Sequence, residues 1–239
     1  MMINIPCCNF CNLLKNLILI VLICPNLLLA DMVLNKSIIY FEPGEPNRED
    51  LEIQNVGDDP LYVQITPKIV HKPGTDKQAR EIFDNPKEAG LLVSPNKLIV
   101  PPKGRKLLRF VNLNKNPQEE RVYRVSVTPV VGDLTAKQSG VKLLIGYEVL
   151  VLVHPINGNF ELTHQRTANQ LTVSNHGTQN VLLRKGTQCA PGIEDEALCT
   201  QVAGKRLYPG NTWITELEEN LPVTYFLSKG KEHTVQTFE

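Results

Sequence analysis

The sequence lacks an excess of charge of either sign. It carries 25 basic and 25 acidic residues among 239, which gives a formal net charge of zero. Binding to nucleic acid or to an anionic membrane surface depends on clustered positive charge. The balanced composition therefore argues against both as partners.

The sequence also lacks the patterns of common catalytic and cofactor sites. No Gly-x-Ser-x-Gly motif and no phosphate-binding glycine loop occur. The acidic run at 194–196 leaves a calcium site and a solvated loop open as interpretations. The histidines are scattered, without the spacing of a metal-ligand pair: His71, His154, His164, His176 and His233. We therefore expect no enzyme, no cofactor, no metal and no small-molecule substrate.

Long apolar runs are confined to the first 30 residues. Lys15 precedes the apolar run 17–23, and the small residue Ala30 stands before Asp31. This order is typical of a secretory signal peptide. Pro25 interrupts the run, so a membrane-spanning helix of about 20 apolar residues is disfavoured. We predict a signal peptide at 1–30, with cleavage after Ala30, and hence an exported protein.

Cysteine is scarce beyond residue 30. Four of the six cysteines lie in the predicted signal peptide, which leaves Cys189 and Cys199. An even pair in an exported chain favours a disulfide. A zinc site is the alternative, but no close histidine pair accompanies the two thiols.

No segment has a convincing helical pattern, whereas short strands with frequent turns recur. Strands are expected at 34–41, 49–56, 61–66, 97–100, 106–111 and 121–128, and the strand at 61–66 is expected to end at Pro67. About seven such strands before residue 155 are typical of an immunoglobulin-like sandwich. The Cys-Trp-Cys signature of antibody domains is absent, so aliphatic packing must form the core.

The segment 141–155 is the longest strand candidate and ends at Pro155. Its odd positions are apolar throughout, whereas its even positions are polar at first and apolar at Leu150 and Leu152. The second half should therefore be buried on both faces and the first half on one. A strand that begins at a sheet edge and ends inside a domain has this pattern; an ordinary core strand is the alternative.

A second set of strands follows a hinge at 156–159. It contains 170–174, 180–184, 212–215, 223–227 and 234–238, separated by turns. We therefore expect two domains, an N-terminal one at 31–155 and a smaller C-terminal sandwich at 156–239.

Several motifs, taken in order, resemble the periplasmic pilus (fimbrial) chaperones of the PapD-like family. They are the turn 99–104, the step 107–109 and the strand 121–125, while 62–68, 72–75, 90–95 and the cysteine pair are similar to the alternate branch of common-pilus and CFA-like systems. The resemblance implies an all-β fold of two immunoglobulin-like sandwich domains in an L-shaped arrangement. It also implies a location in the periplasm.

In that family the chaperone lends an edge strand to a pilus subunit that lacks its last strand, and an outer-membrane usher receives the complex. Carried onto this sequence, the inserted side chains would be Val141, Leu143 and Ile145, with Tyr147 at the end of the segment. The pattern of 141–155 agrees with such strand addition. The alternative is that these side chains face the protein's own core.

The sequence departs from the family at the two residues that anchor the subunit's C-terminal carboxylate. The usual arginine and lysine positions are occupied by Ile38 and Leu150, which cannot pair with a carboxylate. Lys36 and Arg124 are our candidate substitutes. A solvated Lys36 and a structural ion pair of Arg124 are the alternatives.

Two other function classes remain. A structural or adhesive pilus component is disfavoured by the second sandwich and by the short segment before the first strand. A secreted hydrolase with an accessory β domain is disfavoured by the missing catalytic residues.

Overall fold

The protein is almost entirely β-structure. The computed structural model describes residues 31–239 except 115, 131–143, 194 and 231, so the predicted signal peptide lies outside the described residues. The helical parts described are the short helix α2 (Pro86–Ala89) and a 3₁₀ turn at Glu196–Leu198. Among these residues, no helix has the length and apolarity needed to cross a membrane. The predicted all-β fold class is confirmed.

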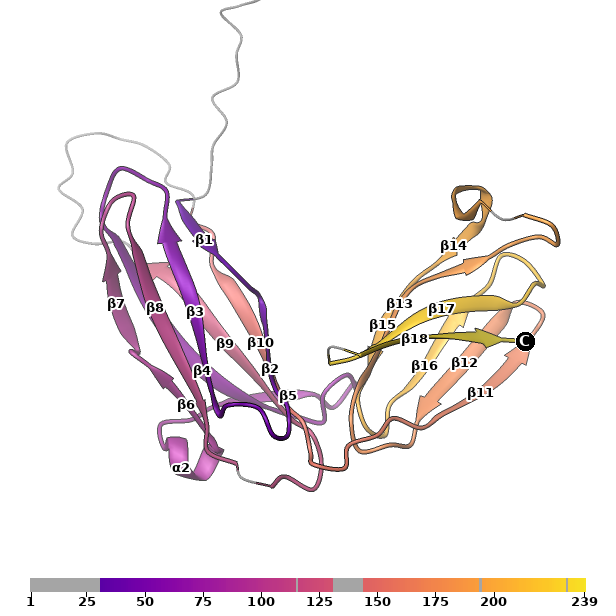
Figure 1. The fold of residues 1–239 in the computed structure, drawn as a ribbon, viewed down its shortest axis with the longest axis horizontal. Coiled ribbons are helices and arrows are strands. Elements are labelled where there is room, and N and C mark those ends of the chain that lie inside the picture. Colours follow the sequence, from indigo (N-terminus) through magenta and orange to yellow (C-terminus); the bar gives the residue numbers. More distant parts are fainter. Residues whose placement is uncertain (1–30, 115, 131–143, 194, 231) are drawn as a thin grey trace, which may run out of the picture. The chain divides into compact units, whose positions relative to one another are not determined.

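The N-terminal sandwich consists of two sheets (Figure 1). The four-stranded sheet has the order β1 (Met32–Leu34), β3 (Arg48–Asn55), β8 (Arg105–Asn112) and β6 (Leu91–Ser94). The six-stranded sheet has the order β2 (Ile38–Phe41), β10 (Tyr147–Val153), β9 (Arg121–Val130), β4 (Leu61–His71) and β5 (Ala79–Ile82), with β7 (Lys97–Val100) also paired to β4. The strand β10 runs parallel to β2 and antiparallel to β9.

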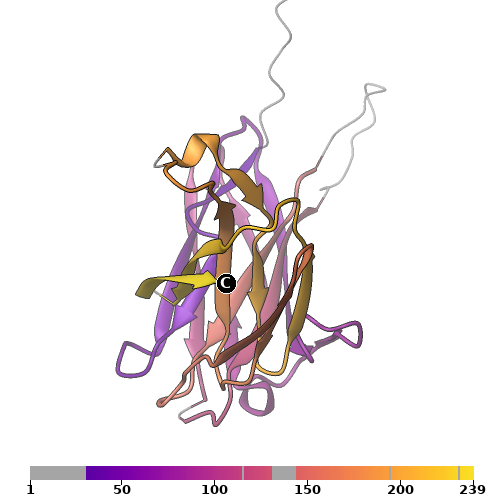
Figure 2. The ribbon, with the colours of Figure 1, turned by 90° about the vertical axis from the view of Figure 1, so that its right-hand side faces the viewer.

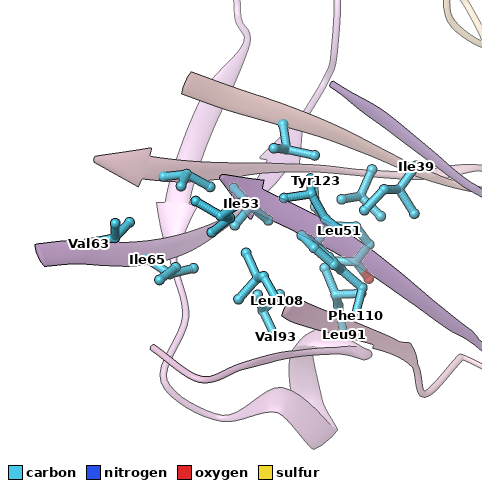
Figure 3. Close-up of a cluster of buried hydrophobic side chains, with 14 of the residues drawn as sticks. Ile39, Leu51, Ile53, Val63, Ile65, Leu91, Val93, Leu108, Phe110 and Tyr123 are labelled. Atoms are coloured by element: carbon cyan, nitrogen blue, oxygen red, sulfur yellow. The ribbon is translucent and has the colours of Figure 1, made fainter. Parts of the chain in front are cut away.

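Alternating apolar side chains from both sheets form the core of this sandwich. Leu51 and Ile53 of β3, Leu108 and Phe110 of β8 and Ile65 of β4 are all buried. Figure 3 shows these side chains gathered in one cluster between the strands. Aliphatic side chains make up most of the cluster, as the missing antibody signature led us to expect.

One predicted strand, 34–41, is wrong because it is two strands in different sheets. The strand β1 pairs with β3, whereas β2 pairs with β10. Between them, the Asn35 backbone N–H donates to the Glu52 carbonyl at 3.2 Å, and the Asn35 side-chain oxygen accepts from the Glu52 N–H at 2.9 Å. These two bonds attach the connection between β1 and β2 to β3 at the point where the chain passes from one sheet to the other.

The predicted end of a strand at Pro67 is also wrong, since β4 continues to His71. Proline interrupts a sheet because it lacks the N–H that the ladder needs. On the side of β4 opposite β9, the strand β7 pairs with residues 61–64 and β5 pairs with residues 68–71. Pro67 therefore lies in the gap between these two partner strands. No ladder bond is lost there, and the strand tolerates the proline.

The C-terminal sandwich also has two sheets, which can be followed from the side in Figure 2. The three-stranded sheet has the order β11 (Leu162–Thr167), β12 (Gln170–Asn175) and β16 (Thr212–Glu216). The five-stranded sheet has the order β14 (Thr200–Val202), β13 (Val181–Gln188), β17 (Val223–Lys229) and β18 (Glu232–Phe238), with β15 (Lys205–Leu207) also paired to β13. Tyr225 and Phe238 are fully buried in its core. The predicted Cys189–Cys199 disulfide is confirmed.

Candidate functional site: the strand β10 and the face beside it

The strand β10 is buried on both of its faces, as its sequence predicts. Val149, Val151 and Val153 point into the core of the N-terminal sandwich and are at most 1% exposed. Leu150 and Leu152 point to the other face of the sheet and pack against a second apolar cluster, which includes Tyr208 of the C-terminal sandwich. The strand is therefore fixed from Tyr147 onward.

The segment just before β10 has a different character. Ile145 is 45% exposed and lies outside any strand. Tyr147 is half-buried, packs against the core, and donates a hydrogen bond from its hydroxyl to the Met32 carbonyl at 2.9 Å. Val141 and Leu143 lie outside the described residues. The structure thus places Ile145 at the surface, whereas Tyr147 is held by its own domain.

The edge of β9 beside Ile145 is open in the described part of the chain. The ladder between β9 and β10 begins at the pair Val127–Tyr147, yet β9 continues for three more residues to Val130. These residues pair with β4 on their other side. A sheet edge of this kind presents backbone groups to which a further strand can bond.

One row of side chains crosses the outer face of the six-stranded sheet at the level of Leu150. The strand registers align Ile38, Leu150, Arg124 and Lys68 as successive neighbours on β2, β10, β9 and β4. The two apolar members therefore lie beside two basic ones. This face changes from apolar to cationic within a single row.

Charged and polar groups continue on this face. The Lys68 ammonium donates to the Ser126 hydroxyl at 3.0 Å and lies 3.8 Å from the Glu148 carboxylate. Arg80 of β5 donates to both oxygens of Glu148 at 3.0 Å. These side chains are only partly buried, so a carboxylate from outside can reach the same cations.

An apolar row lies farther along the same face. Tyr62 is the cross-strand neighbour of both Ile99 and Val130. The three side chains are 41%, 54% and 46% exposed and border a depression of about 770 Å³. Exposed apolar side chains that gather in this way often mark a surface that binds another protein.

Comparison with known proteins finds sequence similarity to fimbrial proteins. No protein-family model matches the chain. A CS1 fimbrial protein of Escherichia coli, named as a fimbrial subunit, is 28% identical over 181 residues, which are 72% of this chain and 75% of that protein. A CFA/I fimbrial protein of Escherichia coli, named in the same way, is 24% identical over 212 residues, which are 84% and 88% of the two chains.

Solved structures extend the comparison to the fold. The class 5 fimbriae chaperone CfaA superposes with a TM-score of 0.61 at 23% identity, over 87% of this chain and 99% of that chain. A chain of the CsuC–CsuE chaperone–tip adhesion complex from Csu pili of Acinetobacter baumannii gives 0.58 at 14% identity, over 87% and 98%. The chain has the two-domain fold of the pilus chaperones.

Within this pilus-chaperone fold, the two predicted anchor residues are held by different sheets. The Lys36 ammonium forms an ion pair with Glu49 of β3 at 2.6 Å, on the four-stranded sheet. Arg124 lies on β9, in the row with Leu150, and its positive charge acts on the Tyr208 hydroxyl. Only Arg124 therefore stands on the face that carries Ile38 and Leu150.

Sequence reasoning missed Lys68 and Arg80. Even positions of β4 alternate onto the outer face, so Lys68 follows Gln64 and Thr66 there. We did not extend this alternation to Lys68 because we expected the strand to end at Pro67. Elsewhere among the described residues, no cluster of three or more potential metal ligands occurs.

Proposed function

We propose that the protein is a periplasmic chaperone that caps pilus subunits by donor-strand complementation and delivers them to an outer-membrane usher. The observation that carries the proposal is the change from an exposed segment to a buried strand at Tyr147. A strand buried on both faces follows it, while an exposed apolar residue, Ile145, precedes it beside the end of β9, which has no strand partner on that side among the described residues. A subunit that lacks its last strand needs both a backbone ladder and apolar side chains to fill its groove.

The inserted side chains in this proposal are Val141, Leu143 and Ile145. Each well-buried aliphatic side chain contributes roughly 1.5–3 kcal/mol before the costs of association are subtracted. The hydroxyl bond of Tyr147 to Met32 marks where the lent segment ends and the chaperone's own core begins. We therefore assign Tyr147 to the end of the donor segment, without a pocket in the subunit.

For the subunit's C-terminal carboxylate, we propose Arg124 together with Lys68. Arginine and lysine bind carboxylates through charge-assisted hydrogen bonds, and these two side chains are cross-strand neighbours beside Leu150. Lys36 remains a prediction, and its ammonium is already paired with Glu49. The two domains of the proposal span 31–155 and 156–239.

The usher is the less direct part of the proposal. The apolar row of Tyr62, Ile99 and Val130 offers a second surface on the sheet that carries the donor segment. A chaperone that hands over its subunit needs such a surface, because the lent segment is already occupied. No catalytic activity is proposed.

A fimbrial subunit is the second candidate, since the two Escherichia coli relatives carry that word in their names. The complete C-terminal sandwich favours the chaperone, because a subunit whose last strand is missing presents a groove where this domain has five paired strands. The two roles make opposite predictions. A chaperone lends a strand, whereas a subunit receives one.

Co-expression in a periplasm tests the proposal. The protein is produced with fimbrial subunits encoded beside it, as wild type and as a Leu143→Asp/Ile145→Asp double variant. Aspartate in an apolar groove is an unpaired buried charge and costs several kcal/mol. We expect a soluble one-to-one complex with the wild type and none with the variant.

The control is an Ile156→Asp/Leu198→Asp double variant. Both residues are exposed apolar side chains, 57% and 73% exposed, and lie outside the donor segment. This variant should still form the complex, and thermal unfolding should show that both variants fold. If the donor variant forms the complex as well as the control does, the segment lends no strand and the proposal fails.

A further inference from the structure

Glu148 places a carboxylate of the protein itself beside the cationic part of the outer sheet face. It follows Tyr147 in β10, and its side chain is 31% exposed. The strand register pairs Glu148 with Ser126 of β9. Two residues farther along the same strands, the register pairs Leu150 with Arg124. The carboxylate therefore lies at the border of the proposed anchor for the subunit's C-terminus.

The Lys68 ammonium has two partners of different kinds. It donates to the Ser126 hydroxyl at 3.0 Å, which is an ordinary hydrogen-bond length. The Glu148 carboxylate lies 3.8 Å from the ammonium, which is close enough for an ion pair but too far for a hydrogen bond. Ser126 therefore positions Lys68, whereas Glu148 contributes its charge.

Arg80 of β5 holds the Glu148 side chain. A single guanidinium nitrogen, Nη1, donates to both carboxylate oxygens at 3.0 Å. The two side chains are 41% and 31% exposed, so a second carboxylate can reach the same surface. Arg80 thus keeps Glu148 close to Lys68 without enclosing either charge.

Positive charge exceeds negative charge on this part of the face. The register places Lys68 beside Arg124, and Arg80 reaches the same area through its bonds to Glu148. Three cations therefore share one carboxylate among these four residues. The excess attracts a carboxylate from outside, but the charge of Glu148 cancels part of that attraction. Two carboxylates on this surface compete for the same cations.

We propose that Glu148 is a built-in competitor for the carboxylate anchor and limits how tightly the protein holds its subunit. The inference rests on the proposed chaperone function. In the free protein, Glu148 partly neutralises Lys68. The subunit's C-terminal carboxylate then takes Lys68 together with Arg124, while Arg80 keeps Glu148. An anchor weakened in this way favours release of the subunit when the lent strand is replaced.

A purely structural ion pair is the alternative role of Glu148. The bonds from Arg80 join β5 to β10, and exposed pairs of this kind contribute little to stability. The two roles predict effects of opposite sign. If the pair orders the cations, Glu148→Gln binds a carboxylate more weakly. If Glu148 competes, the same variant binds a carboxylate more tightly.

The test is the binding of a peptide carboxylate to the protein, followed by NMR chemical shifts. The probe is a short acetylated peptide that alternates valine and threonine and ends in a free carboxylate, and its C-terminal amide is the uncharged reference. We expect Glu148→Gln to bind the free carboxylate roughly two- to fivefold more tightly than the wild type at low salt, since exposed charge pairs have effects of this size. High salt should reduce the gain, and the amide should show none.

The matched control is Glu52→Gln. Glu52 of β3 also pairs with an arginine, Arg105 at 3.3 Å, and its side chain is 32% exposed, but it lies on the four-stranded sheet. This control should bind the peptide as the wild type does. Equal binding of the free carboxylate to Glu148→Gln and the wild type, undetectable binding included, overturns the proposal. An equal gain for the amide overturns it as well.

A second comparison tests whether Glu148 acts through Lys68. The gain from Glu148→Gln should be smaller when it is measured in a Lys68→Met background, because the competitor then has lost the cation that it neutralises. A structural effect of Glu148 elsewhere in the sheet does not depend on Lys68. A gain of the same size in both backgrounds refutes competition at this cation.

Co-expression separates this inference from the function on which it rests. If the wild type forms a one-to-one complex with a subunit but the peptide shows no gain, the chaperone function stands and the competitor is refuted. If no complex forms, the chaperone function fails, and the peptide measurement still decides whether Glu148 competes for a carboxylate.

Discussion

Leu152 offers the sharpest test of how β10 is packed. The side chain is 0% exposed and lies on the outer face of the six-stranded sheet, against Val70, Val122 and Tyr208. Replacing it with alanine removes three carbon groups, worth roughly 2.4 kcal/mol at about 0.8 kcal/mol each. The cavity left behind adds to this loss, and buried leucine-to-alanine changes typically cost about 2.7–5 kcal/mol in total.

We expect Leu152→Ala to lower the free energy of unfolding by about 3 kcal/mol. The lower part of the range applies because the cluster has few members and its neighbours can move into part of the space. Urea denaturation followed by tryptophan fluorescence and circular dichroism measures the change. Since the cluster joins the two sandwiches, both signals should shift.

Leu107→Ala is the matched control. Leu107 lies on β8 and is 53% exposed, so its truncation should change the free energy of unfolding by less than about 0.5 kcal/mol. If Leu152→Ala costs as little as this control, the outer face of β10 is not packed against the second domain. The assignment of Leu150 and Leu152 to a buried cluster would then be wrong.

Two further predictions concern covalent and electrostatic contributions. Replacing both Cys189 and Cys199 with serine opens a loop that the disulfide closes over a separation of 10 residues. The double variant should have a free energy of unfolding lower by about 2.5–3 kcal/mol, measured by urea denaturation. An unchanged urea midpoint would contradict this prediction. Arg109 donates hydrogen bonds of 2.8 and 3.0 Å to Asp50 and holds the pKa of that carboxyl below its usual range. This stabilisation is present near neutral pH and is lost as the pH falls and Asp50 becomes protonated. Asp50→Asn should therefore melt at a lower temperature than the wild type at pH 7, and the difference between their melting temperatures should shrink at pH 3. A difference that is the same at both pH values would contradict the prediction.

The parts of the fold that were predictable rest on local patterns. Alternation placed Leu51 and Ile53 inside β3, and the apolar even positions of β10 correctly predicted burial on both faces. The disulfide followed from the predicted signal peptide and from the count of cysteines. In each case the required information lies within a few residues, because the side-chain period of a strand is two.

The errors arose where a residue's role depends on its partners. Proline by its own chemistry interrupts strands, yet Pro67 is tolerated within β4 because no neighbouring strand requires an N–H at that position. The segment 34–41 has the composition of one strand, yet Asn35 and Glu52 turn it from one sheet to the other. Neither outcome is encoded in the segment itself.

The sequence by itself determined the all-β class, the disulfide and the two-sided burial of β10, since each follows from composition or from period. Only the tertiary structure decided which residues share the face beside β10. Lys68 and Arg124 are 56 positions apart in the chain and become neighbours through the register of β4 and β9. Arg80 and Glu148 likewise meet from β5 and β10, 68 positions apart. Such sites depend on strand pairing over long separations, which no local pattern specifies.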